Sequence, residues 1–141
     1  MLTSDHPNVE LLKRVYGTGR GDGLDVLDTD GVEPFVAHTA GHSPIGGTFV
    51  GRQAMKNHVG LLRQLSGETV RRKSIQFYAD DVWGVVPQVI TASRNGQDLE
   101  MNVCGFWRFT ASGQLAEHWE ACSDTAAWDA FWHAPSNPES S

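Results

Sequence analysis

The sequence predicts an α+β fold in which helices pack on one face of a curved antiparallel sheet. Apolar residues recur at helical spacing near the N-terminus and again after Gly51. From Glu68 onward the pattern changes to strand-like alternation, interrupted by short turn sequences. Asn95-Gly96 lies between two such stretches and is the strongest hairpin signal in the chain. Helices followed by a long antiparallel meander are typical of this fold class.

The first helix is predicted to start near Thr3-Ser4-Asp5, where a capping residue precedes Pro7. Its apolar stripe consists of Val9, Leu12, Val15 and Tyr16. The glycines of residues 17–23 should end this helix, because glycine adopts the left-handed exit readily. This segment matches neither phosphate-loop pattern and follows a helix instead of a strand, so a nucleotide site is not expected.

The middle of the chain should contribute short elements and one longer helix. Residues 24–27 predict a short helix, residues 33–39 a short strand, and residues 41–47 a loop. An extended piece over residues 48–50 leads to an amphipathic helix that opens at Gly51-Arg52-Gln53. Its apolar stripe consists of Met55, Val59, Leu62 and Leu65.

Four strands are predicted for the remaining sheet, over residues 70–78, 82–94, 99–109 and 114–123. Ser123 or Asp124 could cap a last helix, on which Trp128, Phe131 and Trp132 share one face. Residues 134–141 are polar and contain two prolines, and are expected to form a flexible tail. The chain is therefore predicted to be one domain over residues 1–133 with a short tail.

Composition excludes several classes of protein. A length of 141 residues suits one domain with a sizeable core, and 40% hydrophobic residues are typical of a soluble globular protein. The net charge of −6 argues against nucleic acids and membrane surfaces as partners. No apolar run or leader sequence is visible, so a cytoplasmic location is expected. Cys104 and Cys122 should face opposite sides of the sheet, and no disulfide is expected.

The run Leu115–Asp124 carries the main chemical signal. Alternation along a strand places His118, Glu120 and Cys122 on one face, and Leu115, Glu117, Trp119 and Ala121 on the other. An imidazole beside a carboxylate can transfer protons if this face lines a cavity. A buried Glu120 would need a partner, and a structural ion pair with Arg14 or Arg52 is the alternative to a functional role. The basic triplet Arg71-Arg72-Lys73 is interpreted as a solvated face.

Four segments carry a resemblance to a known family: the helix running into Gly21-Asp22, the strand and loop of residues 35–47, the Gly51-Arg52 helix start, and the strand Glu117-His118-Trp119-Glu120. The chain resembles a nuclear transport factor 2-like domain of the SnoaL-like and ketosteroid-isomerase-like branch. The resemblance implies a cone, in which a curved, cystatin-like sheet wraps three helices around an apolar pocket. It also implies a homodimer through the outer sheet face, where Phe106, Arg108, Trp119 and Cys104 would lie.

The resemblance also implies site residues. It places His38 at the position of a general base, Gly105 at the position of an oxyanion-hole aspartate, and Tyr16 near that of an oxyanion tyrosine. His118 and Glu120 would orient the base or act as acid. Alternation along the middle strands adds five pocket residues, namely Trp107, Val86, Gln88, Ile90 and, on the last strand, Cys122.

The leading hypothesis is therefore an enzyme that acts on a hydrophobic, carbonyl-bearing small molecule by acid–base chemistry, as an isomerase, cyclase or dehydratase. Neither a cofactor nor a metal is expected. The alternative is a non-catalytic module of the same fold, which binds a small ligand or serves dimeric assembly.

Overall fold

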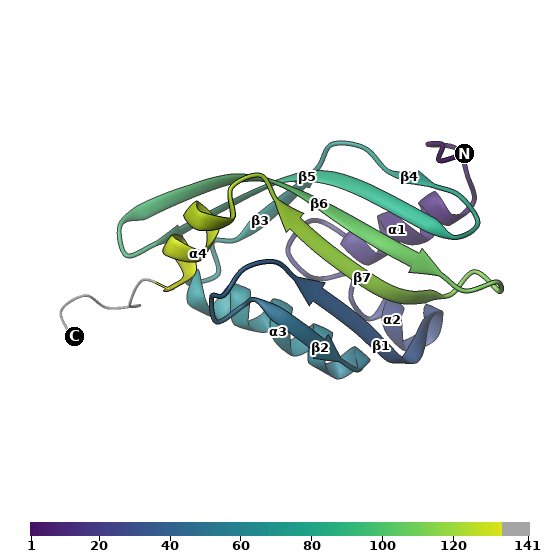
Figure 1. The fold of residues 1–141 in the computed structure, drawn as a ribbon, viewed down its shortest axis with the longest axis horizontal. Helices are drawn as coiled ribbons and strands as arrows, with labels where there is room; N and C mark the ends of the chain where they lie inside the picture. Colours follow the sequence, from purple (N-terminus) through teal and green to yellow (C-terminus); the bar gives the residue numbers. More distant parts are fainter. Residues whose placement is uncertain (134–141) are drawn as a thin grey trace.

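The computed structural model describes residues 1–133 and confirms the predicted α+β fold with a curved sheet (Figure 1). The predicted tail, residues 134–141, lies outside the described residues. The helices are α1 (Asn8–Tyr16), α2 (Val26–Asp30), α3 (Arg52–Leu65) and α4 (Thr125–His133). Helices α3 and α4 begin where predicted, whereas α1 begins only at Asn8, after the predicted Thr3-Ser4-Asp5 cap, and α2 starts two residues and ends three residues later than predicted.

The sheet has the strand order β2-β1-β7-β6-β5-β3, and a short strand, β4, also pairs with β5. Its strands are β1 (Gly31–Thr39), β2 (Gly47–Val50), β3 (Arg71–Ser74), β4 (Tyr78–Ala79), β5 (Trp83–Arg94), β6 (Gln97–Phe109) and β7 (Leu115–Cys122). The predicted strand over residues 70–78 is thus divided into β3 and β4. All pairs are antiparallel except β1 with β7, which run parallel.

The hairpin between β5 and β6 confirms the strongest turn prediction. Asn95 has a φ of 54° and Gly96 a φ of 76°, so both central residues occupy the left-handed region that a type I′ turn requires. The pairing continues from Arg94↔Gln97 to Trp83↔Arg108 without a register shift. Side chains of both strands of this long hairpin belong to the hydrophobic core.

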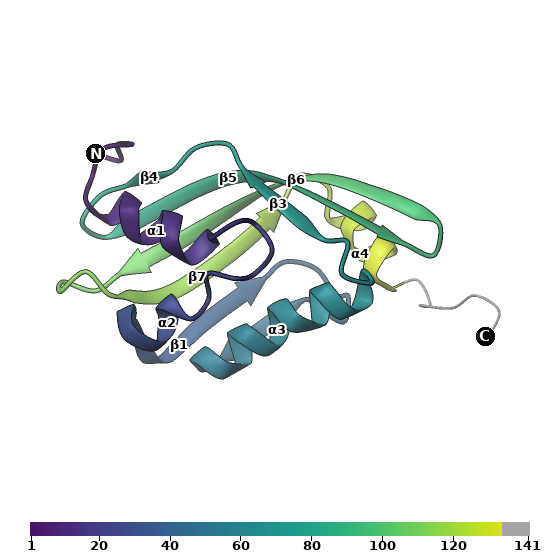
Figure 2. The same ribbon diagram turned by 180° about the vertical axis from the view of Figure 1, so that it is seen from behind.

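Helices α1, α2 and α3 lie on the inner face of the sheet (Figure 2). Side chains of α1, β1, β5 and β6 form one buried cluster, which includes Leu12, Phe35 and Trp107. A second cluster lies near the other end of the sheet, where Trp128 and Trp132 of α4 pack with Leu62 and Ile90. Among the described residues, no helix has both the length and the apolar character that crossing a membrane would demand.

Candidate active site

Strand β7 turns two ionisable side chains toward the helices, as the alternation predicts. His118 is 4% exposed and Glu120 is 5% exposed, whereas Glu117 and Trp119 are only partly buried on the other face. Pairing with β6 sets Trp107 beside His118 and Gly105 beside Glu120. Leu115 is predicted to lie on the face opposite to His118, but it is fully buried, because the register of β6 and β7 shifts next to Phe109.

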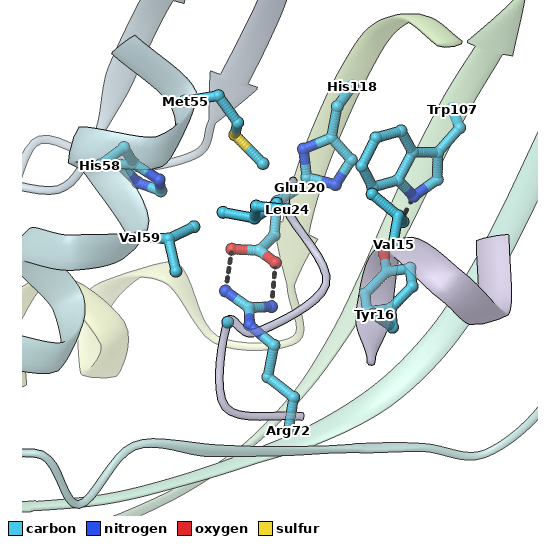
Figure 3. A pocket seen from close by; sticks show the side chains of 11 residues that line it. Val15, Tyr16, Leu24, Met55, His58, Val59, Arg72, Trp107, His118 and Glu120 are labelled. Atoms are coloured by element: carbon cyan, nitrogen blue, oxygen red, sulfur yellow. Dashed lines mark hydrogen bonds and ion pairs between the residues drawn. The ribbon is translucent and has the colours of Figure 1, made fainter. Parts of the chain in front are cut away.

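These residues line a pocket between the sheet and the helices (Figure 3). Its cavity volume is about 40 Å³. Most of its walls are apolar, and the polar groups come from Tyr16, His58, Arg72, Trp107, His118 and Glu120. The apolar side chains are Val15, Leu24, Met55 and Val59, and Gly21 completes the lining. Few, convergent polar groups in a mainly apolar pocket are typical of a small-molecule site.

Tyr16, the last residue of α1, presents its hydroxyl to the pocket. The Trp107 indole Nε1–H donates a hydrogen bond to the Tyr16 oxygen over 2.9 Å. The tyrosine O–H therefore remains available as a donor, since no acceptor for it is found among the described residues. Burial raises the pKa of Tyr16, although the bond from Trp107 opposes this shift. Tyr16 thus keeps its proton at neutral pH.

Gly105 leaves the space that this hydroxyl occupies. A Cβ at position 105 would overlap the Tyr16 hydroxyl, and it would lie 3.2 Å from His118 Nε2 and 3.4 Å from Trp107 Nε1. Tyr16, His118 and Trp107 therefore direct their polar atoms at the same part of β6. From the sequence resemblance, Gly105 is only a position that lacks a functional side chain. In the structure, the absence of a side chain at Gly105 makes room for the Tyr16 hydroxyl.

The imidazole of His118 lies beside the Trp107 ring, with centroids 4.2 Å apart. Both of its ring nitrogens are buried and have no hydrogen-bond partner among residues 1–133. Burial lowers the pKa of His118 from 6.5 to about 4; the attraction of Glu120 opposes this effect, and Arg72 and His58 add to it. At neutral pH His118 is an uncharged group with one N–H and one lone pair free.

Glu120 is paired with Arg72 of β3. Nη1 of Arg72 lies 2.5 Å from Oε1 of Glu120, and the same nitrogen donates to Oε1 of Gln88 over 3.3 Å. Burial alone would raise the pKa of Glu120, but the charge and hydrogen bond of Arg72 outweigh burial and lower it. Burial alone would lower the pKa of Arg72, but Glu120 outweighs it and raises it. Both groups are therefore charged.

This ion pair corrects two predictions. The expected partners of Glu120 are elsewhere, since Arg14 pairs with Asp30 and Arg52 with Glu33. The interpretation of the basic triplet as a solvated face is wrong for Arg72, whose side chain is only 15% exposed. Arg71 and Lys73, on the other face of β3, do remain exposed. Alternation along Arg71-Arg72-Lys73 could have shown that Arg72 differs from its neighbours.

His58 of α3 is a pocket residue that the sequence analysis did not identify. Its Nε2 lies 2.8 Å from the carbonyl oxygen of Ile45, and its ring packs 4.4 Å from that of Phe49. Burial lowers the pKa of His58, although Glu120 and the Ile45 bond oppose this shift. Its position in the stripe with Met55 and Leu62 was the available signal, because residues three and four apart share a helix face.

His38 lies on the opposite face of the sheet, so the expectation that it joins His118 and Glu120 in the pocket is wrong. Its Nε2 is 2.6 Å from Oε2 of Glu117, and its Nδ1 is 3.1 Å from the Thr48 hydroxyl. Its ring stacks on Trp119 with centroids 5.4 Å apart. Alternation along β1 explains this placement, because Phe35, Ala37 and Thr39 face the core.

The remaining predicted pocket residues are distributed along the inner face. Trp107 lines the pocket, whereas Val86 and Ile90 are fully buried in the two hydrophobic clusters and do not line it. Gln88 contributes indirectly through its bond to Arg72. Cys122 lies nearer α4, with its sulfur 3.7 Å from the Thr125 hydroxyl. Within the described residues, no cluster of three potential metal-binding side chains is found.

No family model matches the sequence, and no curated protein matches it. Solved structures do match. Bal32a from a soil-derived mobile gene cassette is 28% identical with a TM-score of 0.80, over 89% of this chain and 95% of that chain. TerC, co-crystallised with polyporic acid, is 16% identical with a TM-score of 0.75, over 92% and 100% of the two chains.

A proposed SnoaL-like polyketide cyclase from Jannaschia sp. CCS1 is 17% identical with a TM-score of 0.73, over 94% of this chain and 99% of that chain. Other neighbours are a nuclear transport factor 2-like protein from Burkholderia and a protein with a cystatin-like fold from Xanthomonas. The chain therefore has the nuclear transport factor 2-like fold, as its sequence predicts.

Proposed function

We propose that the pocket transfers a proton on a carbonyl-bearing small molecule without a cofactor. The observation that carries this proposal is the proximity of the Tyr16 O–H, which donates to no acceptor within residues 1–133, to the uncharged His118 imidazole, which has no hydrogen-bond partner there, in a mainly apolar pocket. The first group can bind a carbonyl oxygen and the second can accept a proton from the neighbouring carbon. Neighbours that include a polyketide cyclase candidate and a co-crystal with polyporic acid support a small-molecule site.

In this mechanism the lone pair of His118 removes a proton from the carbon next to the carbonyl group. The electrons of that C–H bond form a C=C bond, and the carbonyl π electrons move to the oxygen. Tyr16 donates a hydrogen bond to the negative oxygen, while Trp107 holds the hydroxyl in place. In a substrate that has a C=C bond next to that carbon, the enolate is conjugated with this bond, and the imidazolium of His118 returns the proton at the far carbon of the bond. The original C=C bond shifts by one position and the carbonyl group is restored, so the net change is an isomerisation.

Glu120 acts on this step through charge. Its carboxylate favours the protonated form of His118, and Arg72 holds the carboxylate in its ionised state. Glu120 is therefore a positioning residue in this proposal. His38 takes no part, because it lies on the outer face.

Deuterium exchange tests this proposal without knowledge of the natural substrate. Simple ketones are incubated with the protein in D₂O, and incorporation at the carbon next to the carbonyl is followed by NMR. Replacement His118→Gln should lower the protein-dependent rate by at least about 10²-fold, the lower range for a lost general base. Replacement Tyr16→Phe should lower it by about 10²-fold or more. His38→Gln, on the outer face, is the matched control and should leave the rate unchanged.

A second candidate function is non-catalytic binding of a small ligand in the same pocket. The mutual pairing of Arg72 and Glu120 favours it, because a satisfied ion pair needs no role in a reaction. In that case ketones would raise the melting temperature of the protein, yet none would exchange deuterium above the rate in buffer.

We also propose that the chain forms a homodimer through the outer sheet face. Trp83 is 43% exposed and Phe106 is 39% exposed, and both lie on adjacent strands beside Trp119. Together with His38 and Thr48 they line a shallow groove. Neighbouring exposed aromatic rings are typical of an interface. Light scattering should give twice the chain mass, and Phe106→Glu should shift the protein to the monomer.

A further inference from the structure

His58 lies on the wall of the pocket across from Tyr16 and Trp107 (Figure 3). Its Nε2 must carry the proton, because it bonds to the carbonyl oxygen of Ile45. The neutral ring then has a lone pair on Nδ1. This nitrogen is buried and has no hydrogen-bond partner among the described residues. The whole His58 residue is only 5% exposed.

An orphaned acceptor at this depth needs an explanation, because buried polar atoms are nearly always hydrogen-bonded. The neighbours of His58 on the same stripe of helix α3, Met55 and Leu62, are apolar, so His58 is the polar member of a buried helix face. The hydrogen bond from Nε2 to the Ile45 carbonyl fixes the orientation of the ring, and with it the position of Nδ1. His58 is thus held in a single tautomer with its acceptor unused.

The charges of the pocket limit what can bind there. Arg72 and Glu120 neutralise each other, and the donors on Arg72 Nη1 are directed at Glu120 and Gln88. Tyr16, His58 and His118 are uncharged at neutral pH. A ligand carboxylate would therefore be buried without a counter-ion, which is costly. An uncharged ligand fits this environment.

The small volume of the cavity also limits the size of the reacting end of the ligand. About 40 Å³ holds roughly three water-sized groups, at 10–15 Å³ for each. A carbonyl group, one neighbouring carbon and one further oxygen nearly fill it. The rest of a larger molecule would extend along Gly21 and Leu24 at the pocket wall.

We propose that the ligand is an uncharged hydroxy-ketone, whose hydroxyl lies close to the carbonyl and donates a hydrogen bond to Nδ1 of His58. Tyr16 binds the carbonyl oxygen from one wall, and Nδ1 of His58 accepts a hydrogen bond from the hydroxyl at the other. This inference rests on the proposed carbonyl-binding function, to which it adds a second ligand-binding residue and a substrate class. His58 becomes the residue that separates hydroxylated ketones from plain ones.

Acetone and hydroxyacetone are suitable probes, because they are small ketones that differ by one hydroxyl group. Their dissociation constants are measured by NMR titration of protein with ¹⁵N-labelled histidine. Hydroxyacetone should bind about tenfold more tightly, as one hydrogen bond to a buried acceptor allows. Only hydroxyacetone should shift the Nδ1 resonance of His58, and this readout requires no variant.

Two variants of His58 test the roles of its two ring nitrogens separately. His58→Gln keeps a donor near the Ile45 carbonyl but removes the Nδ1 acceptor, and it should reduce the tenfold preference to about one. His58→Asn keeps an acceptor near the Nδ1 position and should retain part of the preference. Equal affinities in the wild type, an unshifted Nδ1 resonance, or an undiminished preference in His58→Gln would each overturn the inference.

A third variant distinguishes failure of this inference from failure of the proposed function. Tyr16→Phe should weaken both probes equally, because both contain the carbonyl group. If Tyr16→Phe leaves acetone binding unchanged, the carbonyl-binding function is wrong. If Tyr16→Phe weakens acetone but hydroxyacetone binds no better than acetone, only the role of His58 is wrong.

Discussion

Removing the ionisable group of His118 should make the protein less sensitive to acid. The folded state holds the pKa of His118 at about 4, against an ordinary value of 6.5. Above pH 6.5 the imidazole is neutral in both states and the shift has no effect on stability. Between pH 6.5 and 4 the unfolded chain binds a proton that the folded protein does not, so stability falls as the pH falls. At 1.36 kcal/mol per pKa unit, His118 accounts for a loss of about 3 kcal/mol.

Urea unfolding at pH 7 and pH 4 measures this loss, with His118→Leu as the comparison. The free energy of unfolding of the wild type should fall by about 3 kcal/mol more than that of the variant. Glu120 and Arg72 are present in both proteins, so their own titration largely cancels in the difference. Equal losses in the two proteins would refute the burial argument, as would an NMR titration of His118 with a midpoint near 6.5.

Three further changes test other parts of the structure. Arg72→Met leaves Glu120 buried without a partner and should lower the unfolding free energy by about 3–5 kcal/mol at pH 7, while the added Glu120→Gln should recover part of that loss. Gly105→Ala should displace the Tyr16 hydroxyl and weaken acetone binding about tenfold, with the melting temperature as a check on folding. Gly96→Ala should cost about 1 kcal/mol in urea unfolding, because its φ of 76° disfavours a side chain.

Most of the fold could be predicted because its signals are local. Helix periodicity, the Asn95-Gly96 turn and the alternation of β7 each depend on a few consecutive residues. The same alternation placed His118 and Glu120 on the inner face, where the structure has them. Tyr16 and Trp107 were identified from the resemblance and from strand parity, respectively, and both line the pocket.

Which face of β1 is directed toward the core could not be predicted in this way. Phe35 and Ala37 alternate with Val36 and His38, so each face of the strand begins with an apolar residue. A shift of one residue moves every side chain to the other face, and neither choice is favoured by this pattern alone. The resemblance to a general-base position led to the prediction that His38 faces the pocket, and this prediction is wrong. Packing of the core against Phe35, which is fully buried, decides the parity in the folded protein.

The pairing of Arg72 with Glu120 depends on the curvature of the sheet. Strands β3 and β7 are separated by β5 and β6, so three strand spacings lie between them. In a flat sheet this is about 14 Å, at 4.7–4.9 Å for each spacing. A contact of 2.5 Å requires that the sheet bend and that the long arginine side chain reach across the concave face. Local sequence patterns carry no measure of curvature, so they pointed to Arg14 and Arg52 as partners of Glu120 and did not identify Arg72.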